Sequence, residues 1–144
     1  MEYNMGPGRE NAALEQRYKD AEVASKQLAA QFRAIGHPSF DEFEGFIHDY
    51  VRIRMLLEPE DELVDSLNAL GQMNLARALG VDLPDLAKID MEAKCGGTSA
   101  VMTKKILLII ALKRDLDVDL SADEAAEITK LSQLIARMYK LYAA

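Results

Sequence analysis

The apolar residues of this chain recur every three or four positions, and that spacing constrains the fold to helices. From Arg9 to Ile35 they step by four and three, which places them on one stripe of a helix. The members of this stripe are Leu14, Tyr18, Ala21, Ser25, Leu28, Phe32 and Ile35. No two neighbouring segments show the alternating pattern of a strand hairpin. We therefore predict an all-α fold.

Glycine, proline and capping residues divide this pattern into successive helices. Gly36 and Pro38 end the first helix, because glycine accepts a left-handed cap and proline disfavours helix in the residue before it. Ser39 and Glu42 then have the spacing of a capping box, and an apolar helical face follows them. The two segments together predict a helical hairpin over residues 9–57.

The rest of the chain predicts three further helices around one irregular segment. The third helix is expected over residues 63–80, and residues 81–97 are the least regular part of the sequence. The fourth helix is expected from Thr98 or Ser99 to about residue 114. Residues 115–120 alternate charged and apolar side chains and predict an extended connector. A second capping-box pattern begins at Ser121 and opens the last helix.

Composition and charge exclude several classes of partner and location. The 144 residues carry 17 Lys and Arg against 24 Asp and Glu, a formal charge of −7, which argues against sequence-independent nucleic-acid binding. The single cysteine, Cys95, has no internal disulfide partner and no zinc-site spacing around it. The longest apolar run, Ile106 to Leu112, is too short to cross a bilayer, and the first residues lack the regions of an export signal. We predict a cytoplasmic protein without membrane insertion.

Few residues suggest that the chain is an enzyme. His37 and His48 both lie far in sequence from Cys95, and no catalytic triad pattern is present. Cys95 stands beside two glycines, where a helix N-terminus would stabilise a thiolate. Because no base is identifiable for it, a small residue in a connector is the better interpretation. We predict no enzyme activity and no metal site, and a thiol enzyme ranks below the functions considered next.

The segment Gly96–Ser99, followed by Lys104 and Lys105, has some elements of a phosphate-binding loop. A true P-loop requires GxxxxGK[ST], and Met102 stands where the second glycine should follow Gly97. What remains is a serine after two glycines at the first turn of a helix, where backbone N–H groups favour a phosphodiester. A plain N-cap explains the same serine.

From Pro59 to its end, the chain resembles an acyl or peptidyl carrier protein. The resemblance lies in the order and spacing of several short motifs rather than in any one of them. These motifs are Leu79-Gly80-Val81-Asp82, the loop from Leu83 to Lys94, Gly96-Gly97-Thr98-Ser99, the phrase Leu116 to Ser121 and the phrase Ile128 to Leu134.

The resemblance implies both a fold and a function. Residues 59–144 would form an acyl-carrier-like four-helix bundle, preceded by a helical hairpin extension over residues 1–58. Ser99 would carry 4'-phosphopantetheine, with Gly96, Gly97 and Thr98 beside the attachment point. The arm would hold an acyl or aminoacyl group as a thioester in lipid or polyketide biosynthesis. The implied partners are a phosphopantetheinyl transferase and dedicated acyl-transferring enzymes.

The chain departs from the carrier pattern around the attachment serine. Thr98 stands where the family usually has Asp or His, and Ala100 stands where it usually has Leu or Ile. The family's recognition helix is typically acidic, whereas this one carries Lys104 and Lys105. The predicted partner-binding residues are Ala100, Met102, Lys104 and Lys105. We expect them to suit a dedicated partner with an acidic surface.

Two alternatives stand beside this hypothesis. Asp65-Ser66-Leu67 is the family's most familiar tripeptide, but no glycine precedes it, and we expect Ser66 to lie inside the first carrier helix. Ser99 is therefore the preferred attachment point. The alternative function is a helical-bundle interaction or adaptor protein that has the carrier architecture without the prosthetic group. The cargo and the oligomeric state stay open.

Overall fold

The structure of the protein, a computed structural model, describes residues 5–79 and 100–144, where helices alternate with short connecting segments. Side chains are described for residues 12–78 and 100–144. The helices are α1 (Met5–Arg33), α2 (Phe40–Arg54), α3 (Leu67–Leu79), α5 (Ala100–Leu116), α6 (Ala122–Glu127) and α7 (Leu131–Ala143). These two ranges contain no strand, so the predicted all-α fold is confirmed.

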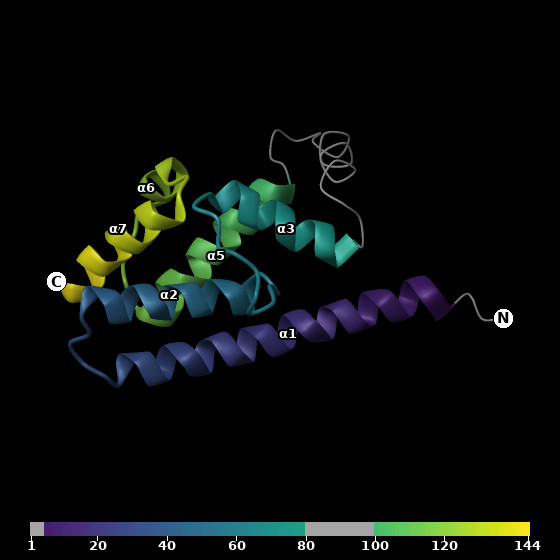
Figure 1. The fold of residues 1–144 in the computed structure, drawn as a ribbon, viewed down its shortest axis with the longest axis horizontal. Helices are drawn as coiled ribbons and strands as arrows, with labels where there is room; N and C mark the ends of the chain where they lie inside the picture. Colours follow the sequence, from purple (N-terminus) through teal and green to yellow (C-terminus); the bar gives the residue numbers. More distant parts are fainter. Residues whose placement is uncertain (1–4, 80–99) are drawn as a thin grey trace.

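The helices α1 and α2 form the predicted hairpin and lie side by side in opposite directions (Figure 1). Gly36 makes the turn between them with a φ of 94°, a left-handed conformation that glycine adopts without strain. The capping box is present: Ser39 Oγ accepts from the Glu42 N–H at 3.1 Å, and the Ser39 N–H donates to Glu42 Oε1 at 2.8 Å. α1 begins at Met5, earlier than predicted, because Pro7 is compatible with the first turn of a helix.

Aromatic rings join the hairpin to α7. The Phe32 ring of α1 stacks on the Phe46 ring of α2 at a centroid distance of 4.3 Å. The Phe43 ring lies 5.3 Å from the Tyr139 ring and 5.7 Å from the Tyr142 ring, both on α7. Such pairs add to the free energy gained from area burial by about 0.5–1.5 kcal/mol each. The last helix is therefore held against the first two.

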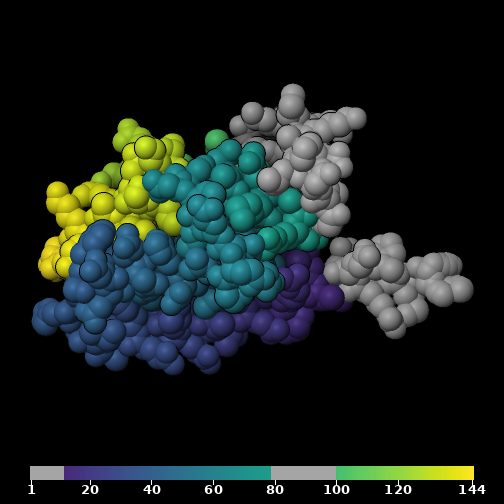
Figure 2. Space-filling view, viewed as in Figure 1, coloured from purple at the N-terminus to yellow at the C-terminus, as the bar shows by residue number. Residues whose placement is uncertain are grey.

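One hydrophobic cluster contains buried residues from α1, α2, α3, α5 and α7. Its largest fully buried side chains are Phe43, Ile47, Tyr50, Leu67, Leu70, Ile109, Leu112, Leu116, Leu120, Leu134 and Ile135. The helix α5 runs through the middle of the arrangement. In the space-filling view it is almost entirely hidden behind α3 and the residues that join α2 to α3 (Figure 2). The hairpin and the later helices thus share one core.

The end of the chain differs from the single last helix that the sequence predicted. Residues 128–130 separate α6 from α7. Gln133 Oε1 accepts from the N–H groups of Thr129 and Lys130, each at 3.0 Å, and the Thr129 carbonyl accepts from the Leu67 N–H at 3.0 Å. Because these groups bond outside a helical ladder, the helix is interrupted there. The capping function of Ser121 is confirmed, since its Oγ accepts from the Glu124 N–H at 3.1 Å.

The start of α3 also differs from the expectation. Ser66 was expected inside a helix, and this is wrong, because Ser66 directly precedes α3 and its Oγ accepts from the Ala69 N–H at 3.1 Å. Asp65 bonds across the molecule to Ser132 near the start of α7. Its carboxylate accepts from the Ser132 N–H and from the Ser132 hydroxyl, each at 2.7 Å. A cap and a long-range contact therefore fix the entry into α3.

The helix α5 extends two residues further than predicted. It ends at Leu116, and Asp117 follows in the left-handed region with a φ of 55°. Residues 118–120 lie outside the helices, but Asp115 and Leu116 belong to α5, so the extended connector predicted over residues 115–120 is wrong at its first positions. Over the described ranges, neither α5 nor any other helix combines the length and apolarity needed to cross a membrane.

Candidate functional site

The predicted attachment segment lies outside the described residues. This holds for Gly96, Gly97, Thr98 and Ser99, and also for Cys95. The described chain resumes at Ala100, which is the first residue of α5. Ser99 is thus the residue that directly precedes α5 in the sequence, and the helix itself shows the surroundings of the predicted site.

The helix α5 exposes four large apolar side chains, which we call the α5 row. They are Met102, Ile106, Leu107 and Ile110, with exposed fractions of 48%, 43%, 54% and 51%. Their spacing places them on one side of the helix, opposite the buried residues that face the core. Exposed apolar side chains gathered on one helix face are typical of a surface that contacts another molecule.

Basic residues lie on the same side of α5 as this row. Lys113 and Arg114 follow Ile110 by three and four positions, which places them beside it on the helix surface. Arg114 is exposed and Lys113 is half-buried. The α5 row therefore carries positive charge at its C-terminal end, in a chain whose overall formal charge is −7.

The predicted partner-binding residues contact different parts of the molecule. Ala100 and Met102 are exposed. Lys104 points toward α1, where its Nζ donates to Tyr18 Oη at 3.0 Å and lies 4.4 Å from the centre of the Tyr18 ring. Lys105 Nζ donates to the Ala126 carbonyl of α6 at 3.3 Å. Both lysines therefore make contacts within the molecule, Lys104 with α1 and Lys105 with α6.

A cavity of about 280 Å³ lies between α1 and α5, and we call it the α1–α5 cavity. The end of α2 and the middle of α3 complete its wall. The lining residues are Tyr18, Ala21, Glu22, Arg54, Met55, Asn74, Lys104, Leu107, Leu108, Ile110, Ala111 and Arg114. Leu107 and Ile110 belong both to this lining and to the α5 row, so the apolar surface of α5 continues into the mouth of the cavity.

A chain of hydrogen bonds fixes one side of the α1–α5 cavity. It begins with Lys104, which donates to Tyr18 Oη. Tyr18 Oη donates to Asn74 Oδ1 at 3.1 Å, and Asn74 Nδ2 donates to the Met55 carbonyl at 2.7 Å. Asn74 is 1% exposed, so these bonds satisfy an otherwise costly buried amide. They connect α1, α3 and α5 with the end of α2.

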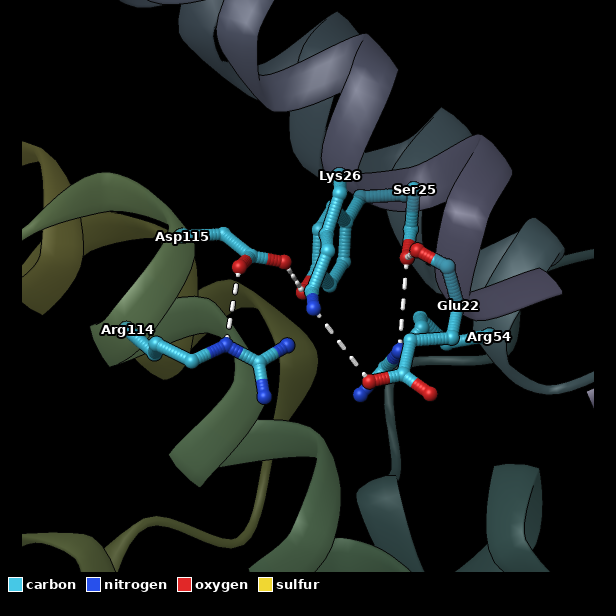
Figure 3. Close-up of polar contacts among 7 residues, drawn as sticks. Glu22, Ser25, Lys26, Arg54, Arg114 and Asp115 are labelled. Atoms are coloured by element: carbon cyan, nitrogen blue, oxygen red, sulfur yellow. Dashed lines mark hydrogen bonds and ion pairs between the residues drawn. The ribbon is translucent and has the colours of Figure 1, made fainter. Parts of the chain in front are cut away.

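A second group of polar contacts includes Arg54 and Arg114, which also line the cavity (Figure 3). Tyr50 Oη donates to Asp115 Oδ2 at 2.6 Å, and Arg114 Nε donates to the other Asp115 oxygen at 3.0 Å. Arg54 Nη1 donates to Ser25 Oγ at 3.4 Å, and its guanidinium lies 5.9 Å from the centre of the Tyr50 ring. These contacts hold Arg54 and Arg114 on facing elements.

The buried phenol and carboxyl of this group keep opposite protonation states. Burial, together with the hydrogen bond to Asp115, raises the pKa of Tyr50, so the phenol stays protonated and donates. Burial alone would raise the pKa of Asp115, but the hydrogen bonds from Arg114 and Tyr50 outweigh it and lower that pKa. Asp115 therefore stays ionised and takes up part of the charge of Arg114.

Positive charge dominates the lining of the cavity. Arg54, Lys104 and Arg114 stand against the single carboxylate of Glu22, which itself pairs with Lys26 at 3.4 Å. The sequence pattern did not predict this site. The available signal was the presence of Tyr18 and a buried serine within the apolar stripe of the first helix, because polar groups on a buried stripe need partners.

The two histidines lie on different elements of the described chain. His37 is exposed in the turn after α1, and His48 is half-buried on α2. Within residues 5–79 and 100–144, no cluster of three or more His, Cys, Asp or Glu side chains is suited to hold a metal ion.

Comparisons with protein-family models, with curated proteins and with solved structures each return no match to this chain. Function is therefore inferred from the motifs of the chain and the surface of α5.

Proposed function

We propose that this protein is a carrier protein that is modified at Ser99 with 4'-phosphopantetheine and holds an acyl or aminoacyl group as a thioester. The observation that carries the proposal is the α5 row, an exposed apolar helix face whose first member, Met102, follows Ser99 by three positions in the sequence. The order and spacing of the short motifs from Leu79 to Leu134 support it.

The order of the later elements supports the same proposal. In carrier proteins, the second helix runs into a phrase that resembles Leu116–Ser121, and a short acidic turn then leads to the last helix. Here α5 ends at Leu116, α6 contains Asp123, Glu124 and Glu127, and α7 follows after residue 130. The acidic α6 therefore stands at the place in the chain where carrier proteins have their acidic turn.

In this role the protein makes no bonds itself. The Ser99 hydroxyl would form a phosphodiester with the phosphopantetheine arm, and the thiol at the end of the arm would carry the cargo. The chain would supply two things: the hydroxyl of Ser99 for attachment, and the α5 row as a surface on which partner enzymes dock.

The α5 row fits the docking part of this role. Its exposed apolar side chains begin within the first turn of α5, and basic residues accompany them toward its end. A partner enzyme would present an apolar centre with an acidic rim, because interfaces pair a desolvated apolar core with complementary charge around it.

The proposal is tested by measuring the intact mass of the protein after incubation with a phosphopantetheinyl transferase and coenzyme A. We expect the wild type to gain the mass of one phosphopantetheine and Ser99→Ala to gain none. Ser66→Ala is the matched control, because Ser66 caps α3 and should still allow modification. A mass gain that persists in Ser99→Ala and disappears in Ser66→Ala would show that the arm is attached to Ser66 and not to Ser99. No gain with several transferases would contradict the carrier function.

A second candidate is an interaction or adaptor protein without a prosthetic group. The observation that favours it is the basic end of the α5 row, which departs from the acidic recognition helix of carrier proteins. It predicts that Ile106→Glu weakens capture of an acidic partner in protein that carries no phosphopantetheine. Capture that requires the modified form would instead support the carrier.

A further inference from the structure

We propose that the α1–α5 cavity is a non-covalent binding site for a small carboxylic acid with an apolar body. The proposal does not depend on modification of Ser99. It is formed by side chains of α1, α2, α3 and α5, all of which belong to the described residues.

The charge of the cavity selects an anion. Three cationic side chains and one carboxylate line it, although acidic residues outnumber basic ones in the chain as a whole, 24 against 17. Arg114 pairs with Asp115, and Arg54 interacts electrostatically with the same carboxylate, whereas the contacts of Lys104 are to the neutral Tyr18. Three cationic side chains against the carboxylate of Glu22 leave the lining with an excess of positive charge, which favours a bound anion.

The walls of the cavity select an apolar body on that anion. Leu107, Leu108, Ile110, Ala111 and Met55 form most of the remaining lining. Leu107 and Ile110 are about half exposed, so a ligand that covered them would remove apolar surface from water. An inorganic phosphate would meet the cations and leave this surface uncovered. The lining therefore favours a carboxylate with a hydrocarbon body over a compact anion.

The size of the cavity limits the ligand. A volume of about 280 Å³ lies at the lower end of the range of small-molecule pockets. The hydrogen bonds of Tyr18, Asn74 and Met55 hold the cavity wall in place, so little ordering would be needed on binding. A carboxylic acid of medium chain length fits these limits.

Octanoate is a suitable probe, and 1-octanol is its neutral counterpart of equal chain length. We expect isothermal titration calorimetry to detect binding of octanoate. The affinity for 1-octanol should be lower by about tenfold or more, because the alcohol cannot form the charge-assisted hydrogen bonds. Inorganic phosphate should not bind. Equal affinities for octanoate and 1-octanol, or no binding of octanoate at millimolar concentration, would overturn the proposal.

Neighbouring lysines of α5 provide a matched pair of variants. Lys104→Met should weaken octanoate binding by about tenfold, and Lys104→Arg should retain it, because the charge remains. Lys105→Met should bind as the wild type does, since Lys105 contacts Ala126 and does not line the cavity. Equal losses in Lys104→Met and Lys105→Met would show that only the overall charge matters and would contradict the assignment.

Two further measurements keep this test independent of folding and of the carrier function. Octanoate should shift the methyl NMR signals of Ala21 and Ala111, which line the cavity from α1 and α5, and should leave that of Ala136 unchanged. Shifts spread over the whole molecule would contradict a single site. Ser99→Ala should bind octanoate like the wild type, so loss of phosphopantetheine attachment and loss of octanoate binding are separate outcomes.

Discussion

The hydroxyl of Tyr50 on α2 donates a hydrogen bond of 2.6 Å to Asp115 on α5, across 65 positions of the sequence. Tyr50 is fully buried, and the Asp115 side chain is 6% exposed. The bond joins the N-terminal hairpin to the helix that carries the α5 row. It is one of the contacts that make the hairpin part of the same core as the later helices.

The variant Tyr50→Phe is expected to lose about 1–3 kcal/mol of unfolding free energy, because it removes one donor from a buried carboxylate. Urea denaturation measures this change. Tyr139→Phe is the control, since the Tyr139 hydroxyl makes a longer bond of 3.4 Å to the Pro38 carbonyl. Equal losses of unfolding free energy in the two variants would contradict a stronger stabilising contribution from the Tyr50–Asp115 hydrogen bond.

The variant Asp65→Ala tests the contact that anchors α7, and its effect depends on pH. The hydrogen bonds from the Ser132 N–H and hydroxyl lower the pKa of Asp65. Its stabilising contribution is therefore complete above the unfolded-state pKa of about 3.9 and is lost as the pH falls through the lower folded-state pKa. We expect the Tm of Asp65→Ala to lie below that of the wild type at pH 7, and the difference to shrink below about pH 4.

Asp49→Ala, which removes an exposed carboxylate of α2, is the control for the Asp65 measurement. Its Tm difference from the wild type should be small at pH 7. A Tm difference for Asp65→Ala that stays constant from neutral to acidic pH would contradict an ionised Asp65 as the acceptor of the Ser132 hydrogen bonds.

Two helical glycines offer a direct comparison of packing with helix propensity. A Cβ added at Gly71 would lie 3.2 Å from both the Val101 carbonyl oxygen and Val101 Cγ1, whereas a Cβ at Gly45 would meet nothing within 4 Å. Alanine is favoured over glycine in a helix by up to about 1 kcal/mol. Gly45→Ala should gain most of this free energy in urea denaturation. Gly71→Ala should gain clearly less than Gly45→Ala or lose stability, because Val101 would have to shift by a few tenths of an ångström. A gain equal to that of Gly45→Ala would refute the close approach of α3 and α5.

Paired substitutions on α5 separate its exposed face from its core face. Leu112 is fully buried, and Leu112→Ala should lose about 2–5 kcal/mol of unfolding free energy. Ile106 belongs to the α5 row, and Ile106→Ala should lose much less, because its side chain is 43% exposed. Thermal unfolding of both variants measures the difference. Equal losses would mean that the row is packed inside the molecule.

The sequence was sufficient to predict the features that depend on neighbouring residues, such as helices, turns and caps. The helical spacing predicts the all-α fold, and the turn at Gly36 and the capping box at Ser39 are confirmed. Ile35 shows the limit of the same reasoning. It continues the predicted stripe of the first helix but is 53% exposed, because α1 ends at Arg33 and Ile35 no longer follows the helical face.

The contacts between distant helices were beyond what local patterns can predict. Lys104 and Tyr18 are separated by 86 positions, and periodicity defines which face of a helix is apolar but not which helix covers it. Lys104 was therefore assigned to a partner surface, although it bonds to α1. The interruption between α6 and α7 was missed for the same reason, since the bond from Leu67 to Thr129 that accompanies it comes from α3.

The most direct test of the account is to locate the prosthetic group on the chain. The full protein is produced together with a phosphopantetheinyl transferase, digested, and its peptides are analysed by tandem mass spectrometry. The account predicts that the peptide containing Ser99 carries one phosphopantetheine and that the peptide containing Ser66 carries none. An unmodified Ser99 peptide, from protein made with an active transferase, would contradict the proposed carrier function.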